Sequence, residues 1–217
     1  LLRRTNDEQP SVSLAACTAL VNLSQEQAVV LKLLRFGVVD RVMDYMREGT
    51  CKHTRELIML ITNVSQLEEG ARAVMQKGKG SLEGFHLGKL LGMFLSPFDE
   101  SKKDDPTEYL ANVLTNITRT IDGRKFVLEP GRGLVMALAK QLLPGCGKIR
   151  RAGCANTLRN CLYTCRADGT LPTILEAKSA IPLILRPISG EEPKEMEDSV
   201  REALAEAVLM LAAEEEG

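Results

Sequence analysis

Residues 16–23 read Ala-Cys-Thr-Ala-Leu-Val-Asn-Leu, and the pattern of this stretch returns three more times along the chain. The later copies cover residues 57–64, 110–117 and 154–161. Counted from the Asn at the seventh position, positions −6, −5, −2 and +1 are apolar or small in every copy. Because residues at i, i+1, i+4 and i+7 form one stripe of an α-helix, the pattern predicts four related helices.

The spacing between the copies predicts the fold. Their Asn residues lie 41, 53 and 44 positions apart, at Asn22, Asn63, Asn116 and Asn160. Repeats of about 40 to 47 residues are typical of armadillo and HEAT arrays, in which stacked helices bury a shared core. We therefore predict an all-α, armadillo/HEAT-like, right-handed helical solenoid of about four to five repeats over residues 1–217.

Short helices are expected between the long ones. Gly70 and Gly123 each lie seven residues after a repeat Asn, and each precedes a short helix-like run, at residues 71–76 and 124–128. The order of helix, turn, short helix, Gly and helix is that of an armadillo repeat rather than a simple hairpin.

Composition excludes several classes of protein. The 217 residues are 44% hydrophobic but only 4% aromatic, without Trp, so that burial depends on Leu, Ala, Val and Ile. The formal net charge of −1 gives no general reason to expect nucleic-acid binding. No apolar run reaches about 18 residues, so no membrane span is predicted. The chain begins without Met, and we expect it to be a fragment of a longer array.

Polar and charged segments divide the chain. A polar insertion loop at about residues 96–107 accounts for the long middle spacing, and Asp104 or Asp105 is expected to cap the third repeat helix. Residues 111–170 carry ten Lys or Arg against three Asp or Glu, whereas the acidic segment and final helix at 191–217 carry ten acidic residues against two basic ones. The basic block is therefore a candidate surface for an acidic partner.

The repeated Asn is the main functional signal. It lies about 150° around the helix from the middle of the apolar stripe, so core burial does not explain it. Its amide could grip the backbone of an extended partner, or it could be structural, bonding the backbone near its helix end or bridging to the neighbouring repeat. The candidate partner-binding residues on this face and beside it are Asn22, Asn63, Asn112, Asn116, Arg119, Arg124, Asn156, Arg159, Asn160 and Tyr163.

Other motifs have simpler explanations. Three of the repeat Asn residues are followed two positions later by Ser or Thr, which matches a glycosylation acceptor but is better explained by the repeat itself. Cys17, Cys154 and Cys161 occupy stripe positions, so we expect buried, reduced thiols in a cytosolic or nuclear protein. His53 and His86 lie far from the cysteines in sequence. We predict no metal, no cofactor, no catalytic residues and no enzyme activity.

Three segments carry a resemblance to a known family. Residues 116–124 (Asn-Ile-Thr-Arg-Thr-Ile-Asp-Gly-Arg) resemble the "Asn-x-Ser/Thr-Arg…Gly-Arg" segment of the eukaryotic Hgh-type armadillo-like proteins. Residues 150–161 are similar to their "Arg-x-Gly-…-Leu-x-Asn-Cys" segment. Residues 181–192 are similar to their "Leu-Leu-x-Pro-Leu-x-Gly-Pro-Glu" run. The likeness covers about residues 50–217 in order and spacing.

The resemblance implies a cytoplasmic, non-enzymatic adaptor, with a nuclear pool as a second location. Such proteins bind translation elongation factor two and help to bring it to the chaperonin for folding. The expected partners are therefore this elongation factor and the chaperonin, with no nucleic acid and no membrane, and the chain is expected to be monomeric. The alternative is a general armadillo scaffold that binds extended peptide segments.

Overall fold

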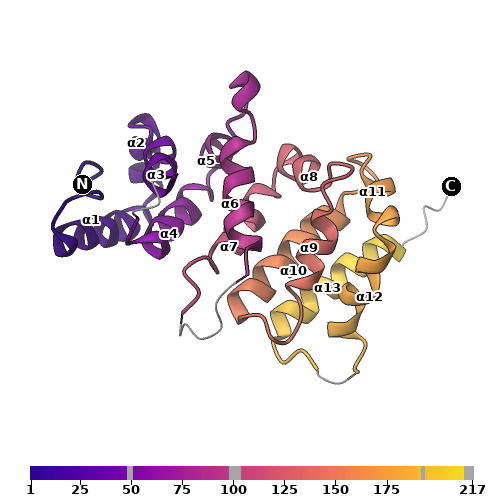
Figure 1. The fold of residues 1–217 in the computed structure, drawn as a ribbon. Helices are drawn as coiled ribbons and strands as arrows, with labels where there is room; N and C mark the ends of the chain where they lie inside the picture. The colour runs from indigo at the N-terminus through magenta and orange to yellow at the C-terminus, as the bar shows by residue number, and fades with distance from the viewer. Residues whose placement is uncertain (48–50, 98–103, 192–193, 213–217) are drawn as a thin grey trace. The chain divides into compact units, whose positions relative to one another are not determined.

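The computed structural model describes residues 1–47, 51–97, 104–191 and 194–212. These residues form thirteen α-helices and three short 3₁₀ segments, with no strand among them (Figure 1). The all-α prediction is therefore confirmed. The chain divides into two compact units, Leu1–Val113 and Leu114–Gly217, and the division falls within the seventh helix.

Unit 1 is built from six complete helices and one 3₁₀ segment. They are α1 (Pro10–Leu23), α2 (Gln27–Arg35), α3 (Val38–Arg47), α4 (Thr54–Val64), α5 (Glu68–Val74), η1 (Gly80–Leu82) and α6 (Phe85–Leu95). The two long helices that carry the first two repeat copies, α1 and α4, pack against each other, and α2, α3 and α5 pack around α4.

Unit 2 begins within the seventh helix, whose first residues belong to unit 1. Its elements are α7 (Leu110–Ile117), α8 (Ile121–Val127), α9 (Leu134–Lys140), α10 (Lys148–Tyr163), α11 (Leu171–Glu176), η2 (Lys178–Ala180), α12 (Ile181–Leu185), η3 (Arg186–Ile188) and α13 (Asp198–Ala212). The fourth repeat copy lies in α10, and α13 packs along α10 as the most extensive helix pair of the unit (Figure 1).

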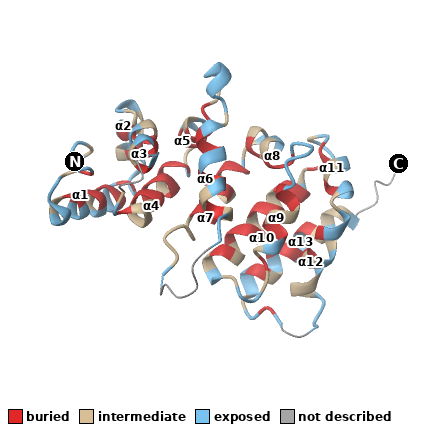
Figure 2. Cartoon of the chain, in the orientation of Figure 1, coloured by how far each residue is buried: buried red, intermediate tan, exposed pale blue. Residues whose placement is uncertain are grey.

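The apolar stripe of the repeat forms the core of each unit (Figure 2). Of the sixteen stripe residues in the four copies, fifteen are buried, and the twelve in the last three copies are at most 2% exposed. Leu23 is the exception, at 45% exposed, and it lines an apolar groove with Leu20, Val29, Leu33 and Phe36. The periodicity thus identified the buried faces of α4, α7 and α10 correctly.

The short helices α5 and α8 begin earlier than the sequence predicts. Gly70 and Gly123 are the third residues of these helices instead of their preceding turns. A Cβ added at Gly70 would lie 1.9 Å from the carbonyl oxygen of Val64, and one at Gly123 would lie 2.2 Å from that of Ile117. Glycine is therefore needed so that each short helix can approach the last residue of the preceding long helix.

The segment before α7 also differs from the prediction. Asp105 does not cap the third repeat helix, α7, because its Oδ1 accepts hydrogen bonds from both the backbone and the hydroxyl of Thr107. This local turn occupies the polar groups of Thr107, and regular α-helix begins only at Leu110. The rest of the predicted insertion loop, residues 98–103, lies outside the described residues, as do 192–193 and 213–217 of the acidic end.

We expect Gly70→Ala to lower the free energy of unfolding by about 1–3 kcal/mol, because the added methyl group must displace a helix carbonyl. Gly88→Ala is the matched control within unit 1, since a Cβ at this helical position meets nothing within 4 Å. Alanine there should be neutral or stabilising by up to about 1 kcal/mol. Urea unfolding followed by circular dichroism measures both variants, and equal effects would contradict the close-approach role of Gly70.

Candidate functional site

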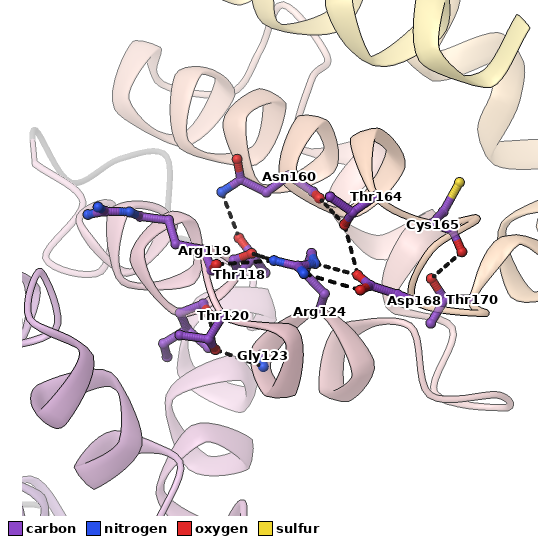
Figure 3. Close-up of polar contacts among 11 residues, drawn as sticks. Thr118, Arg119, Thr120, Gly123, Arg124, Asn160, Thr164, Cys165, Asp168 and Thr170 are labelled. Atoms are coloured by element: carbon purple, nitrogen blue, oxygen red, sulfur yellow. Dashed lines mark hydrogen bonds and ion pairs between the residues drawn. The ribbon is translucent and has the colours of Figure 1, made fainter. Parts of the chain in front are cut away.

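The repeated Asn residues bridge successive repeats. In unit 1, Asn63 Nδ2 on α4 donates to the carbonyl oxygen of Val21 (3.1 Å) and to Ser24 Oγ (2.9 Å). In unit 2, Asn160 Nδ2 on α10 donates to the carbonyl oxygen of Thr115 (3.1 Å) and to Thr118 Oγ (3.2 Å), as Figure 3 shows for the hydroxyl contact. In both cases the acceptors lie one residue before and two residues after the Asn of the preceding copy. The structure thus gives these two amides the bridging role that the sequence left open.

The Ser or Thr two residues after the Asn belongs to the same device. Ser24 Oγ donates to the Val21 carbonyl at 2.7 Å, and Thr118 Oγ donates to the Thr115 carbonyl at 3.1 Å. Ser65 makes the equivalent bond to the Thr62 carbonyl at 2.9 Å. The Asn-x-Ser/Thr spacing, which also fits a glycosylation acceptor, is therefore explained by an inter-repeat bridge and a local bond at the helix end.

The other predicted Asn residues have different surroundings. Asn22 is exposed at the end of α1, whereas Asn112 and Asn116 on α7 are half-buried. Asn156 Nδ2 donates to the Ala152 carbonyl of its own helix at 2.9 Å. Asn63 and Asn160 therefore each join one repeat to the next within a unit.

Arg124 is held firmly in unit 2. Its Nη2 donates to Asp168 Oδ1 at 3.2 Å, its Nε donates to the other carboxylate oxygen, and its Nη1 donates to the carbonyls of Thr118 and Arg119 (Figure 3). Thr164 Oγ donates to Asp168 at 2.8 Å. The hydrogen bond from Arg124 holds the pKa of Asp168 below its ordinary value of 3.8. Arg124 thus ties the end of α7 to the loop after α10, and Asp168 is a partner that sequence reasoning missed.

The acidic end of the chain pairs with the basic block. Arg151 makes a bidentate ion pair with Glu195, with Nε–Oε2 and Nη2–Oε1 distances of 2.7 and 3.2 Å, and both side chains are largely buried. Burial of Glu195 works to raise its pKa, but the bonds from Arg151 and the Glu197 amide outweigh it and lower the pKa. Lys148 pairs with Glu197 at 2.7 Å. These two of the ten basic residues of 111–170 are therefore paired with the acidic end within unit 2.

One polar groove of unit 2 brings five of the predicted residues together. It has a volume of about 400 Å³ and is lined by Thr118, Arg119, Arg124, Arg159, Asn160, Tyr163, Thr164 and Glu206. We call it the arginine groove. Arg119 is exposed, and its side chain makes no ion pair or hydrogen bond with any residue in the described part of the chain. Figure 3 shows its guanidinium pointing away from the Arg124–Asp168 pair. Tyr163 is 55% exposed at the last position of α10.

The cysteines are packing residues. Cys17, Cys154, Cys161 and Cys165 are buried and all are free thiols. Burial raises the pKa of Cys17 to about 11 and that of Cys161 to about 12. Within the described ranges, no three His, Cys, Asp or Glu side chains converge as a metal site requires, and no described helix is long and apolar enough to cross a membrane.

The fold and the groove define an all-α helical-repeat protein with a polar, partly basic face. A crystal structure of an engineered protein shares this fold, with a TM-score of 0.75 over 97% of this chain and 77% of the engineered one, at only 14% identity. The family described as "Domain of unknown function (DUF383)" matches residues 4–216, and the chain belongs to this family.

Its curated relatives carry one name. The chain is 26% identical to a "Protein HGH1 homolog" of Xenopus tropicalis, covering all of this chain and 64% of that protein. It is 29% identical to the homolog of Dictyostelium discoideum over 69% of this chain and 42% of that protein, and 25% identical to the human homolog over 91% and 56%. The resemblance to the Hgh-type family is thereby confirmed, and the aligned part of the chain covers between 42% and 64% of the length of these relatives.

We expect Asn160→Ala to lower the free energy of unfolding by about 1–3 kcal/mol, because it leaves the Thr115 carbonyl and the fully buried Thr118 without the bridging amide. Asn156→Ala, on the same helix, removes only a bond to its own helix and should change stability by less than about 0.5 kcal/mol. Thermal and urea unfolding of the two variants provide the comparison. Similar losses in both would remove the case for an inter-repeat bridge.

The Arg124–Asp168 pair predicts a dependence of stability on acid. Because the pKa of Asp168 in the folded chain lies below 3.8, its contribution is present above that value and is lost as pH falls through the lowered pKa. The unfolding free energy of the wild type should therefore fall more steeply below about pH 4 than that of Asp168→Asn. Asp44→Asn removes an exposed carboxylate from a surface pair and should keep the wild-type slope. Parallel curves for the wild type and Asp168→Asn would rule out this contribution.

Proposed function

We propose that this chain is a non-enzymatic protein-binding adaptor that engages translation elongation factor two and helps to bring it to the chaperonin for folding. Membership of the family supports this, because the Hgh-type resemblance implies that role. The helical-repeat fold also supports it, since stacked helices present extended surfaces suited to large protein partners. The proposal places the chain in the cytoplasm as a monomer without a cofactor.

The arginine groove is the observation that carries the binding role. Tyr163 and Arg119 are among the residue types that contribute most to protein interfaces, and both are exposed in the groove that the bridging Asn160 also lines. The Asn160 amide and the Arg124–Asp168 pair hold the walls of this groove in place. A preformed wall with exposed anchors favours recognition of another protein, because little side-chain order has to be imposed on binding.

The same contacts favour a structural over a catalytic use of the charged residues. Two largely buried carboxylates of unit 2, Asp168 and Glu195, are each engaged by an Arg in a two-point ion pair. Their pKa values are lowered, which keeps them ionised at neutral pH and unsuited to general acid catalysis. We accordingly assign these groups to joining helices.

Binding to purified eukaryotic elongation factor two, measured by biolayer interferometry with the chain immobilised, tests the proposal. We expect saturable binding, and a further signal when purified chaperonin is added. Tyr163→Ala should weaken the affinity at least about tenfold, or about 1.4 kcal/mol, as loss of an aromatic interface anchor. Phe36→Ala is the control, because it removes an exposed aromatic side chain in unit 1.

A folded chain that fails to bind the elongation factor would contradict the proposal. Capture from cytosol of unrelated proteins that share one short linear motif, without the elongation factor, would instead favour the general peptide scaffold.

A further inference from the structure

The final described helix, α13, contains a position that corresponds to the repeated Asn of α4 and α10. Counted from Glu206, positions −6, −2 and +1 of α13 are Val200, Leu204 and Ala207, all buried, whereas position −5 is the charged Arg201. Glu206 accepts a hydrogen bond from the side chain of Arg159, the residue just before Asn160. Asn160 likewise contacts the residue just before Asn116, but through the backbone carbonyl of Thr115. Glu206 therefore occupies in α13 the place that Asn holds in α4 and α10.

This substitution changes the chemistry of the position. An Asn amide donates hydrogen bonds to the helix end of the preceding repeat, whereas an ionised Glu only accepts them. Glu206 Oε2 instead accepts from Arg159 Nη1 at 3.4 Å, and the two side chains are 58% and 37% exposed. Such a long, solvent-exposed pair contributes little stability and exchanges readily with another carboxylate.

A second row of exposed side chains lies three positions after the repeat positions. Arg119, Tyr163 and Leu209 each lie three residues after the repeat position of α7, α10 and α13. Arg119 and Tyr163 line the arginine groove, and Leu209 is 68% exposed on α13. Along unit 2 this row therefore offers a guanidinium, an aromatic ring and an aliphatic side chain in that order.

We infer that the arginine groove binds an acidic peptide segment with large apolar side chains, and that Glu206 competes with this segment for Arg159. The inference rests on the proposed function and specifies its partner chemistry. A carboxylate of the segment pairs with Arg119 and Arg159, and its apolar side chains contact Tyr163 and Leu209. Glu206 then acts as an internal substitute for the ligand carboxylate and lowers the apparent affinity.

Helix spacing sets the pattern of the segment. Packed helices lie about 8–10 Å apart, and an extended chain advances about 3.3 Å per residue. One step along the row therefore spans about three residues of an extended partner. An acidic residue opposite Arg119 places apolar residues about three and six positions away, opposite Tyr163 and Leu209.

Fluorescence anisotropy with a labelled ten-residue peptide tests this inference on the full chain. The peptide carries two Glu at one end and Leu about three and six positions along, and a second peptide has the reverse order. We expect one of them to bind saturably. Glu206→Gln should tighten binding roughly threefold, the effect of removing one exposed competing charge, and Arg119→Ala should weaken it roughly tenfold.

Each of the two test variants has a control variant with the same change in charge. Glu176→Gln removes an exposed carboxylate from α11, and Lys140→Ala removes an exposed cation from the end of α9, both outside the groove. Each should change peptide affinity by less than about twofold. A tightening by Glu176→Gln equal to that by Glu206→Gln, or equal losses in Lys140→Ala and Arg119→Ala, would show general charge attraction and overturn the inference. Absence of binding by both peptides would also overturn it.

Binding of the elongation factor by the same preparations separates the two proposals. If the factor binds but neither peptide does, the groove inference fails and the adaptor proposal stands. If the peptides follow the expected pattern but the factor does not bind, the groove inference stands and the assigned client is wrong.

Discussion

The stacking of repeats within each unit depends on the side-chain amide of one Asn. This amide donates hydrogen bonds to the end of the preceding repeat helix. The last carbonyl groups of every α-helix lack partners within the helix, and leaving them buried and unpaired costs about 1–3 kcal/mol each. Asn63 and Asn160 supply the missing donors to α1 and α7, and the neighbouring hydroxyl groups of Ser24 and Thr118 complete the arrangement. Apolar burial brings the helices together, but it is non-directional. These bridges fix how one repeat lies on the next.

The short helix that follows α4 or α7 also packs closely against the end of that helix. Gly70 and Gly123 let α5 and α8 lie against the ends of α4 and α7, where any side chain would meet a carbonyl oxygen. The Thr120 hydroxyl accepts from the Gly123 amide at 3.1 Å and so caps α8, which begins at Ile121, two residues before the glycine. The Asn, the Ser or Thr two residues later and the Gly seven residues later are thus one structural unit. Each of these residues either makes a hydrogen bond at the end of a packed helix or leaves room for the next helix to approach that end.

The sequence predicted most of the fold because the same helix pattern recurs in four copies. The stripe positions follow from apolar periodicity. The starts of α7 and α8 do not, because Asp105 and Thr120 make local hydrogen bonds whose choice of partner depends on the folded backbone. Asp168, Glu195 and Glu206 lie about 44 to 47 residues from the arginines that they contact, so their roles depend on repeat stacking. A signal for Glu206 existed in the buried spacing of α13, but without Asn at that position the repeat pattern did not reveal it.

The structural use of the repeated Asn limits the hydrogen bonds that it can offer to a binding partner. An Asn whose two amide hydrogens are used between repeats keeps only its oxygen for a partner, so it cannot hold an extended backbone by both donor and acceptor. In the binding mode that we propose, recognition depends on the side chains three residues further on, which lie beyond the bridge. In unit 2 these are Arg119 and Tyr163, which line the arginine groove. In that proposal the Asn maintains the stacking, and the binding residues can vary without disturbing it. In α13 the corresponding position is Glu206 instead of Asn, and its carboxylate lines the arginine groove.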